Sequence, residues 1–316
     1  MPDNKTKNTC FASGYMEEMI MCGIVGYIGE EQAAPILLEG LEKLEYRGYD
    51  SAGIAVYNGT TIEMMKSMGR LKILDELTHG GATLPGTVGI GHTRWATHGS
   101  PSDVNAHPHF NKDKSIVVVH NGIIENYMKL KKKLESKGYE FVSETDTEII
   151  AHLLDYYYKG DPLETIAKIM HRMEGSYALG IMFSDQPDKL YAVRKDSPLI
   201  VGRSSVGNLI ASDVPAVLKY TRDVYFIENE EIVCMTKDDI TFYNIDEEEL
   251  EKRPPQLNGI LTLRKKAAMS SLCSRRCMNS PRLSATLLIP ALRMEMWSLR
   301  SWECLTTRSA ASARST

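Results

Sequence analysis

Cys22 stands in a context that suits a nucleophile. Met21 precedes it, and the apolar run Gly-Ile-Val-Gly-Tyr-Ile at 23–28 follows, which indicates a strand with the cysteine at its start. If translation began at Met21 and that methionine were removed, Cys22 would carry an α-amine beside its thiol. An α-amine has a reference pKa of roughly 7.7–8.0, so near neutrality it can accept the proton that the thiol releases. A buried structural cysteine is the alternative interpretation of this stretch alone.

Arg94 lies in a second cluster, Gly-His-Thr-Arg-Trp-Ala-Thr-His-Gly at 91–99, which His107-Pro108-His109 follows. Four histidines in so short a span suggest a metal site. The sequence His107-Pro108-His109 splays its two rings, however, and no carboxylate–histidine spacing familiar from zinc sites is present, so we expect no metal. The planar guanidinium of Arg94 is better suited to bind a ligand carboxylate, with an ordinary surface arginine as the alternative.

Asn121 and Gly122 come at the end of an apolar run, residues 117–119, that predicts a strand. The commonest structure for an Asn-Gly pair is a hairpin turn. The alternative is an oxyanion hole, in which the Asn121 side-chain amide and the Gly122 backbone N–H both point at a developing negative charge.

Asp146 belongs to the segment Ser-Glu-Thr-Asp-Thr-Glu at 143–148, which predicts the start of a helix. Its simplest role, or that of Thr145, is to cap the helix ahead of an acidic first turn. Asp146 can instead hold a ligand ammonium group. Together with Arg94 it would then bind both ends of a free α-amino acid.

The elements that must position these residues are grouped rather than strictly alternating. Pro35 suits the first turn of a helix whose apolar face is Leu37, Leu41 and Leu44, and further helices are predicted at 124–138, 146–157 and 163–173. Strands are predicted in two groups, at 23–28, 54–57, 87–93 and 115–120, and then at 177–183, 189–194, 199–203, 208–212, 223–227, 231–235 and 240–244. This order favours a layered α+β domain over an alternating βαβ fold.

Composition limits the class of protein. The hydrophobic content is 43% and the formal net charge is −4, which gives no indication of a nucleic-acid partner. No apolar run approaches the roughly 20 residues of a membrane span, and residues 1–20 do not form a secretory signal. The six cysteines lack paired spacing, and Cys273 and Cys277 have no second pair for a metal. We therefore expect reduced thiols and a cytoplasmic protein.

Five motifs stand in one order along the chain: Cys-Gly-Ile-Val-Gly at 22–26, Arg-Gly-Tyr-Asp-Ser-Ala-Gly at 47–53, His-Thr-Arg-Trp-Ala-Thr-His-Gly at 92–99, His-Asn-Gly-Ile-Ile-Glu-Asn at 120–126 and Ser-Glu-Thr-Asp-Thr-Glu at 143–148. This order closely resembles the class II, N-terminal-nucleophile (Ntn) glutamine amidotransferases. Within that class it resembles the glutaminase half of the glutamine–fructose-6-phosphate aminotransferase (isomerising) family. The resemblance covers about residues 22–250 and implies a four-layer αββα fold of two antiparallel sheets, with no cofactor.

The resemblance also implies roles in catalysis. The Cys22 thiolate would attack the side-chain amide of L-glutamine, with its own α-amine as base and then as acid. Asn121 and Gly122 would stabilise the tetrahedral oxyanion. Hydrolysis of the resulting γ-glutamyl thioester would give glutamate and ammonia. Arg47 would pack near the Cys22 amine and keep the site ordered.

Substrate binding follows from the same resemblance. Arg94 would bind the glutamine carboxylate and Asp146 its α-ammonium group. Trp95, Thr97 and His98 would belong to a loop that closes over bound glutamine and excludes water.

Both ends of the chain lie outside this resemblance. Residues 1–21 carry mixed charges and would block the Cys22 amine, so we expect them to be a non-native extension that is absent from the active form. Residues 258–316 carry ten Lys and Arg against two Glu, a clear break in composition. Suitable codons for this tail, translated in the adjacent frame, yield strings that resemble the family's inter-domain linker. We therefore expect 251–316 to be an out-of-frame, disordered tail.

In complete members of this family, the ammonia passes to a sugar-isomerase domain and becomes the amine of glucosamine 6-phosphate, and those proteins are homodimers. Nothing in this chain resembles that domain, so we expect the glutaminase half-reaction alone. Two alternatives stay open. One is another class II amidotransferase, such as an amidophosphoribosyltransferase, and the other is a non-catalytic glutamine-binding module.

Overall fold

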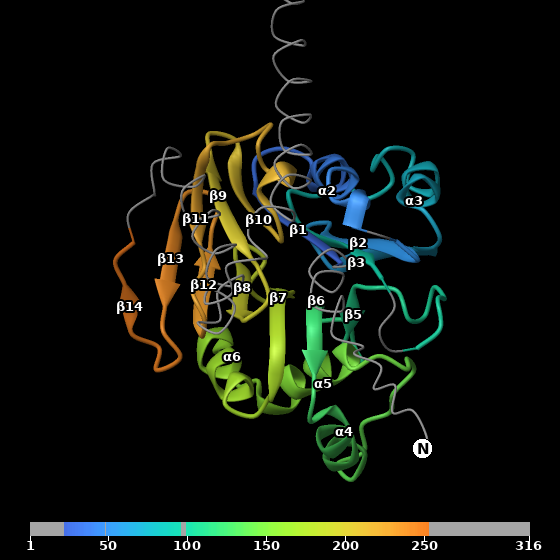
Figure 1. Ribbon diagram of the computed structural model, residues 1–316, viewed down its shortest axis with the longest axis vertical. Coiled ribbons are helices and arrows are strands. Elements are labelled where there is room, and N and C mark those ends of the chain that lie inside the picture. The colour runs from blue at the N-terminus through green and yellow to red at the C-terminus, as the bar shows by residue number, and fades with distance from the viewer. Residues whose placement is uncertain (1–21, 48, 96–98, 253–316) are drawn as a thin grey trace, which may run out of the picture. The chain divides into compact units, whose positions relative to one another are not determined.

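The computed structural model describes residues 22–47, 49–95 and 99–252, and their core is formed by two seven-stranded sheets (Figure 1). Every pairing between neighbouring strands is antiparallel. The first sheet has the order β11-β9-β10-β1-β4-β2-β3, and the second has the order β14-β13-β12-β8-β7-β6-β5. The predicted class, an α+β fold with two antiparallel sheets, is confirmed.

The first sheet places the strand that follows Cys22 at its centre. Its members are β11 (Asp223–Phe226), β9 (Ile200–Ser204), β10 (Gly207–Ala211), β1 (Gly23–Gly29), β4 (Val88–Arg94), β2 (Ser51–Tyr57) and β3 (Ile62–Met68). All seven residues of β1 are buried because the strand has neighbours on both edges and layers on both faces.

The second sheet holds the other half of the candidate site. Its members are β14 (Glu249–Leu250), β13 (Ile240–Tyr243), β12 (Glu231–Met235), β8 (Leu190–Lys195), β7 (Gly175–Phe183), β6 (Ile116–Ile124) and β5 (His109–Phe110). The long pair formed by β6 and β7 runs in register from Ile116 opposite Phe183 to Ile124 opposite Gly175.

Helices cover the outer faces of the two sheets, which makes four layers in all. The helices are α2 (Ala33–Glu42), α3 (Leu71–Leu77), α4 (Tyr127–Glu135), α5 (Thr147–Tyr157) and α6 (Pro162–Met170), with 3₁₀ turns at Glu45–Arg47 and Val214–Ala216. Helices α2 and α3 pack on the first sheet, and α4, α5 and α6 share a core with the second.

Strand alternation accounts for the layering. Along β6, Ile116 and Val118 belong to the core shared with α5 and α6, whereas Val117 and Val119 belong to the core between the sheets. Because successive side chains of a strand point to opposite faces, an apolar run buries both faces of the sheet at once. The apolar runs of the sequence therefore correspond to strands covered on both sides.

One alternative interpretation and one helix boundary were wrong. Asn121-Gly122 is not a hairpin turn, because β6 continues through it to Ile124 and stays paired with β7. The helix predicted at 124–138 begins only at Tyr127. Strands β3, β5 and β14 and helix α3 were not predicted at all.

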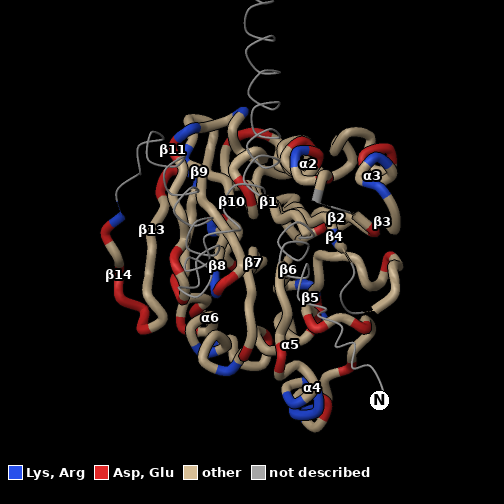
Figure 2. Tube along the Cα trace, in the orientation of Figure 1, with Lys and Arg blue, Asp and Glu red and all other residues tan. Residues whose placement is uncertain are grey.

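Charged side chains gather on the outer helices and loops. Helix α4 is an example, where Lys positions cluster along the tube (Figure 2). The helix carries four lysines and buries only Leu130 and Leu134. Within the described ranges, no helix is long and apolar enough to cross a membrane.

Candidate active site

Cys22 lies immediately before β1, at the end of the central strand of the first sheet. It is half-buried, and the Trp95 backbone N–H donates a hydrogen bond to its Sγ at 3.1 Å. Burial raises the pKa of the Cys22 thiol, and Asp50 adds to the increase, against smaller opposing effects of the Trp95 N–H and of Arg94. The thiol is therefore protonated at neutral pH and needs a base to become a nucleophile.

Asn121 reaches Cys22 from the opposite sheet. Its Nδ2 donates a 2.7 Å hydrogen bond to the Cys22 backbone carbonyl, and its side chain is 2% exposed. Both sequence-predicted residues are thus adjacent, although 99 positions separate them along the chain.

Gly122 follows Asn121 with φ of +123°, a conformation that L side chains rarely adopt. A Cβ atom at this position would lie 2.1 Å from the Ser176 carbonyl oxygen. Only glycine fits here, because the backbone of β7 passes too close for any side chain.

Arg94, the last residue of β4, is 3% exposed, so the alternative of an ordinary surface arginine was wrong. Its Nη1 lies 3.7 Å from Asp50 Oδ1, and its Nη2 donates to the Gly99 carbonyl at 2.9 Å. The Asp50 backbone N–H in turn donates to the Arg94 carbonyl at 2.7 Å. These contacts hold a buried cation beside the Cys22 end of the first sheet.

Asp146 occupies the N-cap position of α5, but its side chain makes no capping hydrogen bond. Instead, Asp146 Oδ2 accepts a 2.9 Å hydrogen bond from the Ile124 backbone N–H. The carboxylate is therefore buried against the end of β6, two residues beyond Gly122. A simple capping role, the alternative for this residue, does not describe its contacts.

Glu148, in the first turn of α5, organises the segment before the helix. It accepts hydrogen bonds from the backbone N–H groups of Val142 and Ser143 and from the Ser143 hydroxyl, at 2.7–2.9 Å. Burial alone would raise its pKa, but the His152 ring, whose Nε2 lies 3.5 Å from Oε1, and the hydrogen bonds from Val142 and Ser143 lower the pKa to about 2. Glu148 is thus a buried carboxylate that fixes the segment before α5 to the first turn of the helix.

The histidines near Arg94 form a buried cluster rather than splayed rings. His92 and His107 stack with centroids 4.1 Å apart, and His107 meets His109 edge to face at 4.8 Å. The Thr147 hydroxyl contacts His107 Nε2 at 3.3 Å and His120 Nδ1 at 2.9 Å. Among the described residues, no three His, Cys, Asp or Glu side chains are placed to hold a metal ion.

The remaining candidates are partly outside the described residues. The Trp95 backbone contacts Cys22, and its side chain is 43% exposed. Thr97 and His98 lie outside the described ranges, as does the side chain of Arg47.

Sequence reasoning missed two members of the site, Asp50 and His92. Asp50 pairs with Arg94, and His92 contacts Asn121. Each stands inside one of the five motifs, which was the available signal, but its partner lies far away along the chain.

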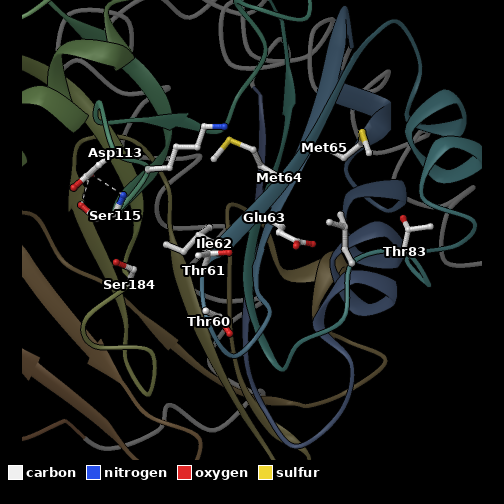
Figure 3. A pocket seen from close by; sticks show the side chains of 12 residues that line it. Thr60, Thr61, Ile62, Glu63, Met64, Met65, Thr83, Asp113, Ser115 and Ser184 are labelled. Carbon is white, nitrogen blue, oxygen red and sulfur yellow. Dashed lines mark hydrogen bonds between the residues drawn. The ribbon is translucent and has the colours of Figure 1, made fainter.

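A cavity of about 740 Å³ lies elsewhere, beside the edge strand β3 (Figure 3). Its lining includes Ile62, Glu63, Asp113, Ser115 and Ser184, and the Ser115 hydroxyl donates a hydrogen bond to Asp113 Oδ1. None of the candidate catalytic residues lines it.

Fold and site together define a class of protein. Residues 92–219 match the family described as "Glutamine amidotransferase domain". A glutamine phosphoribosylpyrophosphate amidotransferase from B. subtilis superimposes with a TM-score of 0.63 at 25% identity, covering 72% of this chain and 50% of that one. A glutamine aminotransferase class-II domain protein from Silicibacter pomeroyi (TM-score 0.51, 14% identity, 71% of this chain and 99% of that chain) shares the fold. The chain contains a glutamine amidotransferase domain with the Ntn-hydrolase fold.

Curated relatives narrow the class. Glutamine–fructose-6-phosphate aminotransferase (isomerizing) from Clostridium acetobutylicum is 59% identical over 240 residues, which are 76% of this chain and 39% of the relative. The protein of that name from Thermococcus kodakarensis is 44% identical over 265 residues, 83% of this chain and 44% of the relative. The domain is homologous to the glutaminase half of the glutamine–fructose-6-phosphate aminotransferases, and the chain spans less than half the length of these two relatives.

Proposed function

We propose that this domain hydrolyses L-glutamine to glutamate and ammonia, with Cys22 as the nucleophile. The observation that carries the proposal is the 2.7 Å hydrogen bond from Asn121 Nδ2 to the Cys22 carbonyl. It puts an amide donor of the second sheet beside the residue that carries the thiol, and Gly122 follows that donor in the chain, which supports an arrangement suited to acyl transfer.

The first step is activation of the thiol. Because burial raises the pKa of Cys22, the proton has to move to a base, and the α-amine of an N-terminal Cys22 is the nearest such group. The Sγ–H proton passes to the amine, and the thiolate forms a bond to the glutamine amide carbon. A peptide nitrogen has no basic lone pair, so this step requires a chain that begins at Cys22.

The next steps are collapse of the adduct and hydrolysis. The carbonyl electron pair moves to oxygen, where Asn121 Nδ2–H and the Gly122 N–H stabilise the negative charge. The carbon–nitrogen bond then breaks as the ammonium group returns its proton to the leaving nitrogen, which departs as ammonia. Water attacks the thioester with the amine again as base, and glutamate leaves as the carbon–sulfur bond breaks.

Substrate recognition is assigned to the two buried charges. Arg94 offers a guanidinium for the glutamine α-carboxylate, and Asp146 offers a carboxylate for the α-ammonium group. Trp95, Thr97 and His98 are proposed to line the bound substrate, and Arg47 to support the Cys22 amine. Each charge is held in place by its own partner, Asp50 for Arg94 and Ile124 for Asp146.

The destination of the ammonia is taken from the relatives. Their name states that they aminate fructose 6-phosphate, so we propose that this domain supplies ammonia for that reaction, in the cytoplasm and in a dimeric assembly. Residues 22–250 constitute the proposed glutaminase unit. The predictions for 1–21 and for residues after 252 lie outside the described ranges.

The test is an assay of the chain that begins at Cys22. Glutamine is supplied with and without fructose 6-phosphate, and glutamate, ammonia and glucosamine 6-phosphate are measured, with Cys22→Ala as control. We expect glutamate and ammonia in equal amounts, and none from the variant. Glutamine binding without turnover would support a binding module, and binding of phosphoribosyl pyrophosphate would support the other amidotransferase.

A further inference from the structure

His92 lies in the first sheet and contacts a residue of the second. It lies in β4 of the first sheet, opposite Ile24 on one side and Gly53 on the other, and it is fully buried. Its ring stacks on His107 at 4.1 Å with an interplanar angle of 15°, so it has little freedom to rotate. Across the gap between the sheets, its Nε2 lies 2.9 Å from Asn121 Oδ1.

The other hydrogen bond of Asn121 determines which atom donates in its contact with His92. The Asn121 Nδ2 donates to the Cys22 carbonyl, so Oδ1 is the atom that faces His92. An amide oxygen can only accept, and therefore His92 Nε2 must carry a proton. With the amide turned over, its oxygen would face the Cys22 carbonyl oxygen, and these two acceptors would have no proton between them.

The state of the ring agrees with this geometry. Burial, opposed by the bond to Asn121, lowers the pKa of His92 to about 3, so the ring is neutral at physiological pH and carries one proton. That proton is on Nε2, where Asn121 Oδ1 accepts it. His92 is thus a neutral donor of fixed direction.

We propose that His92 is a positioning residue for the oxyanion hole. It holds the Asn121 amide so that Nδ2 faces Cys22, with one Nδ2 hydrogen on the Cys22 carbonyl and the second available to the oxyanion. The proposal rests on the glutaminase function proposed above. It goes beyond it by giving the buried histidine of the His-Thr-Arg-Trp motif a role that acts through Asn121.

The kinetic test compares two substitutions of His92 in the chain that begins at Cys22. His92→Leu removes the donor, whereas the amide nitrogen of His92→Gln can replace Nε2. We expect His92→Leu to lower kcat for glutamine about 100-fold, the size of a lost oxyanion-hole donor, with KM changed less than threefold. His92→Gln should recover at least tenfold of that loss. An unchanged kcat in His92→Leu would overturn the proposal.

A double variant separates positioning from general stability. In an Asn121→Ala background, His92→Leu should lower kcat no further, because His92 acts only through Asn121. Phe183→Leu removes a buried aromatic ring that packs on Tyr158 and Tyr191, away from the proposed site, and serves as the matched stability control. Multiplicative losses in the double variant would contradict the proposal.

A spectroscopic measurement keeps the inference independent of turnover. In ¹⁵N-labelled protein, the Asn121 side-chain amide hydrogens should exchange with solvent at least tenfold faster in His92→Leu than in the wild type or in Phe183→Leu. Equal exchange rates would overturn the role of His92 even if the wild type hydrolyses glutamine. A wild type without glutaminase activity but with this difference would overturn the proposed function and leave the positioning by His92 supported.

Discussion

Asn121 Nδ2 and the Cys22 carbonyl oxygen are 2.7 Å apart, and this hydrogen bond joins the two sheets of the domain. Cys22 comes from the first sheet and Asn121 from the second. The bond orients Cys22, the residue immediately before β1, and the amide donor toward each other. Packing between the sheets therefore determines the geometry of the proposed nucleophile and oxyanion hole.

Removal of the Asn121 amide should reduce catalysis far more than binding. We expect Asn121→Ala to lower kcat by about 10²–10³ with a small change in KM, because the lost donor acts on charge that develops only in the transition state. Steady-state glutamate release measures both constants. A rise in KM with unchanged kcat would assign Asn121 to substrate binding instead.

Gly122→Ala should destabilise the domain as well as reduce activity. A side chain at φ +123° costs on the order of 1–3 kcal/mol, and the added Cβ would lie 2.1 Å from the Ser176 carbonyl. Urea unfolding of Gly122→Ala and of Gly138→Ala makes a matched comparison, since Gly138 has φ of +88° with open space around it. Equal losses of stability in the two variants would refute the close-contact explanation.

Substrate charge recognition predicts a change in KM for Asp146→Ala. Loss of a charge-assisted contact of about 1.5–3 kcal/mol corresponds to a rise in KM of roughly 10–150-fold. Asp161→Ala is the control, because Asp161 caps α6 with its side chain and lies outside the proposed site. For glutamine analogues that lack the α-amine, Asp146→Ala should leave KM unchanged. An equal rise in KM for those analogues would contradict the proposed contact between Asp146 and the α-ammonium group.

The buried histidines predict loss of stability in acid. Burial above all lowers the pKa of His92 to about 3 and the pKa values of His107 and His109 well below the usual range. Between about pH 6.5 and the folded-state pKa values, the unfolded chain binds more protons than the folded one, so stability falls as pH falls. Within that window, each histidine lowers the free energy of unfolding by about 1.4 kcal/mol for each pH unit of acidification, and the three together lower it by about 4 kcal/mol.

Urea unfolding at intervals from pH 7.5 to 4.5 measures this slope. His109→Gln should reduce this slope by about 1.4 kcal/mol per pH unit, the value for one proton. Glu148, with a pKa of about 2 in the folded state, adds to the loss only below about pH 4.3, where the unfolded chain takes up its proton. A free energy of unfolding that stays constant from pH 7 to pH 5 would show that the histidines are not held neutral.

The sheets and main helices were predictable because their signals are local. The apolar runs around Ile24 and Val118 indicated strands, and the spacing of Ile149, Ile150, Leu153 and Leu154 indicated α5. Strand β3 was missed because it is an edge strand whose central residues are only partly buried, which blurs the alternation. Asn121-Gly122 favours a turn locally, but pairing with β7 outweighs that preference.

The site was only partly predictable because its contacts are not local. The pairs Arg94–Asp50 and His92–Asn121 join residues that lie far apart along the chain, and no spacing rule connects them. Motif resemblance supplied the candidates Cys22 and Asn121, but not the neighbours that hold them. Asp146 shows the same limit: its local sequence favours a cap, whereas its carboxylate contacts β6.

The most direct test concerns the amine of Cys22. Glutamate release is compared for the chain that begins at Cys22 and for a chain engineered to retain residues 1–21, with equal folding verified by urea unfolding. We predict that the first hydrolyses glutamine and that the second is at least 10²-fold slower, because its Cys22 nitrogen is a peptide nitrogen and cannot act as the base. N-terminal sequencing of each assayed sample identifies the active species. Equal turnover by the intact longer chain would contradict the N-terminal-nucleophile account.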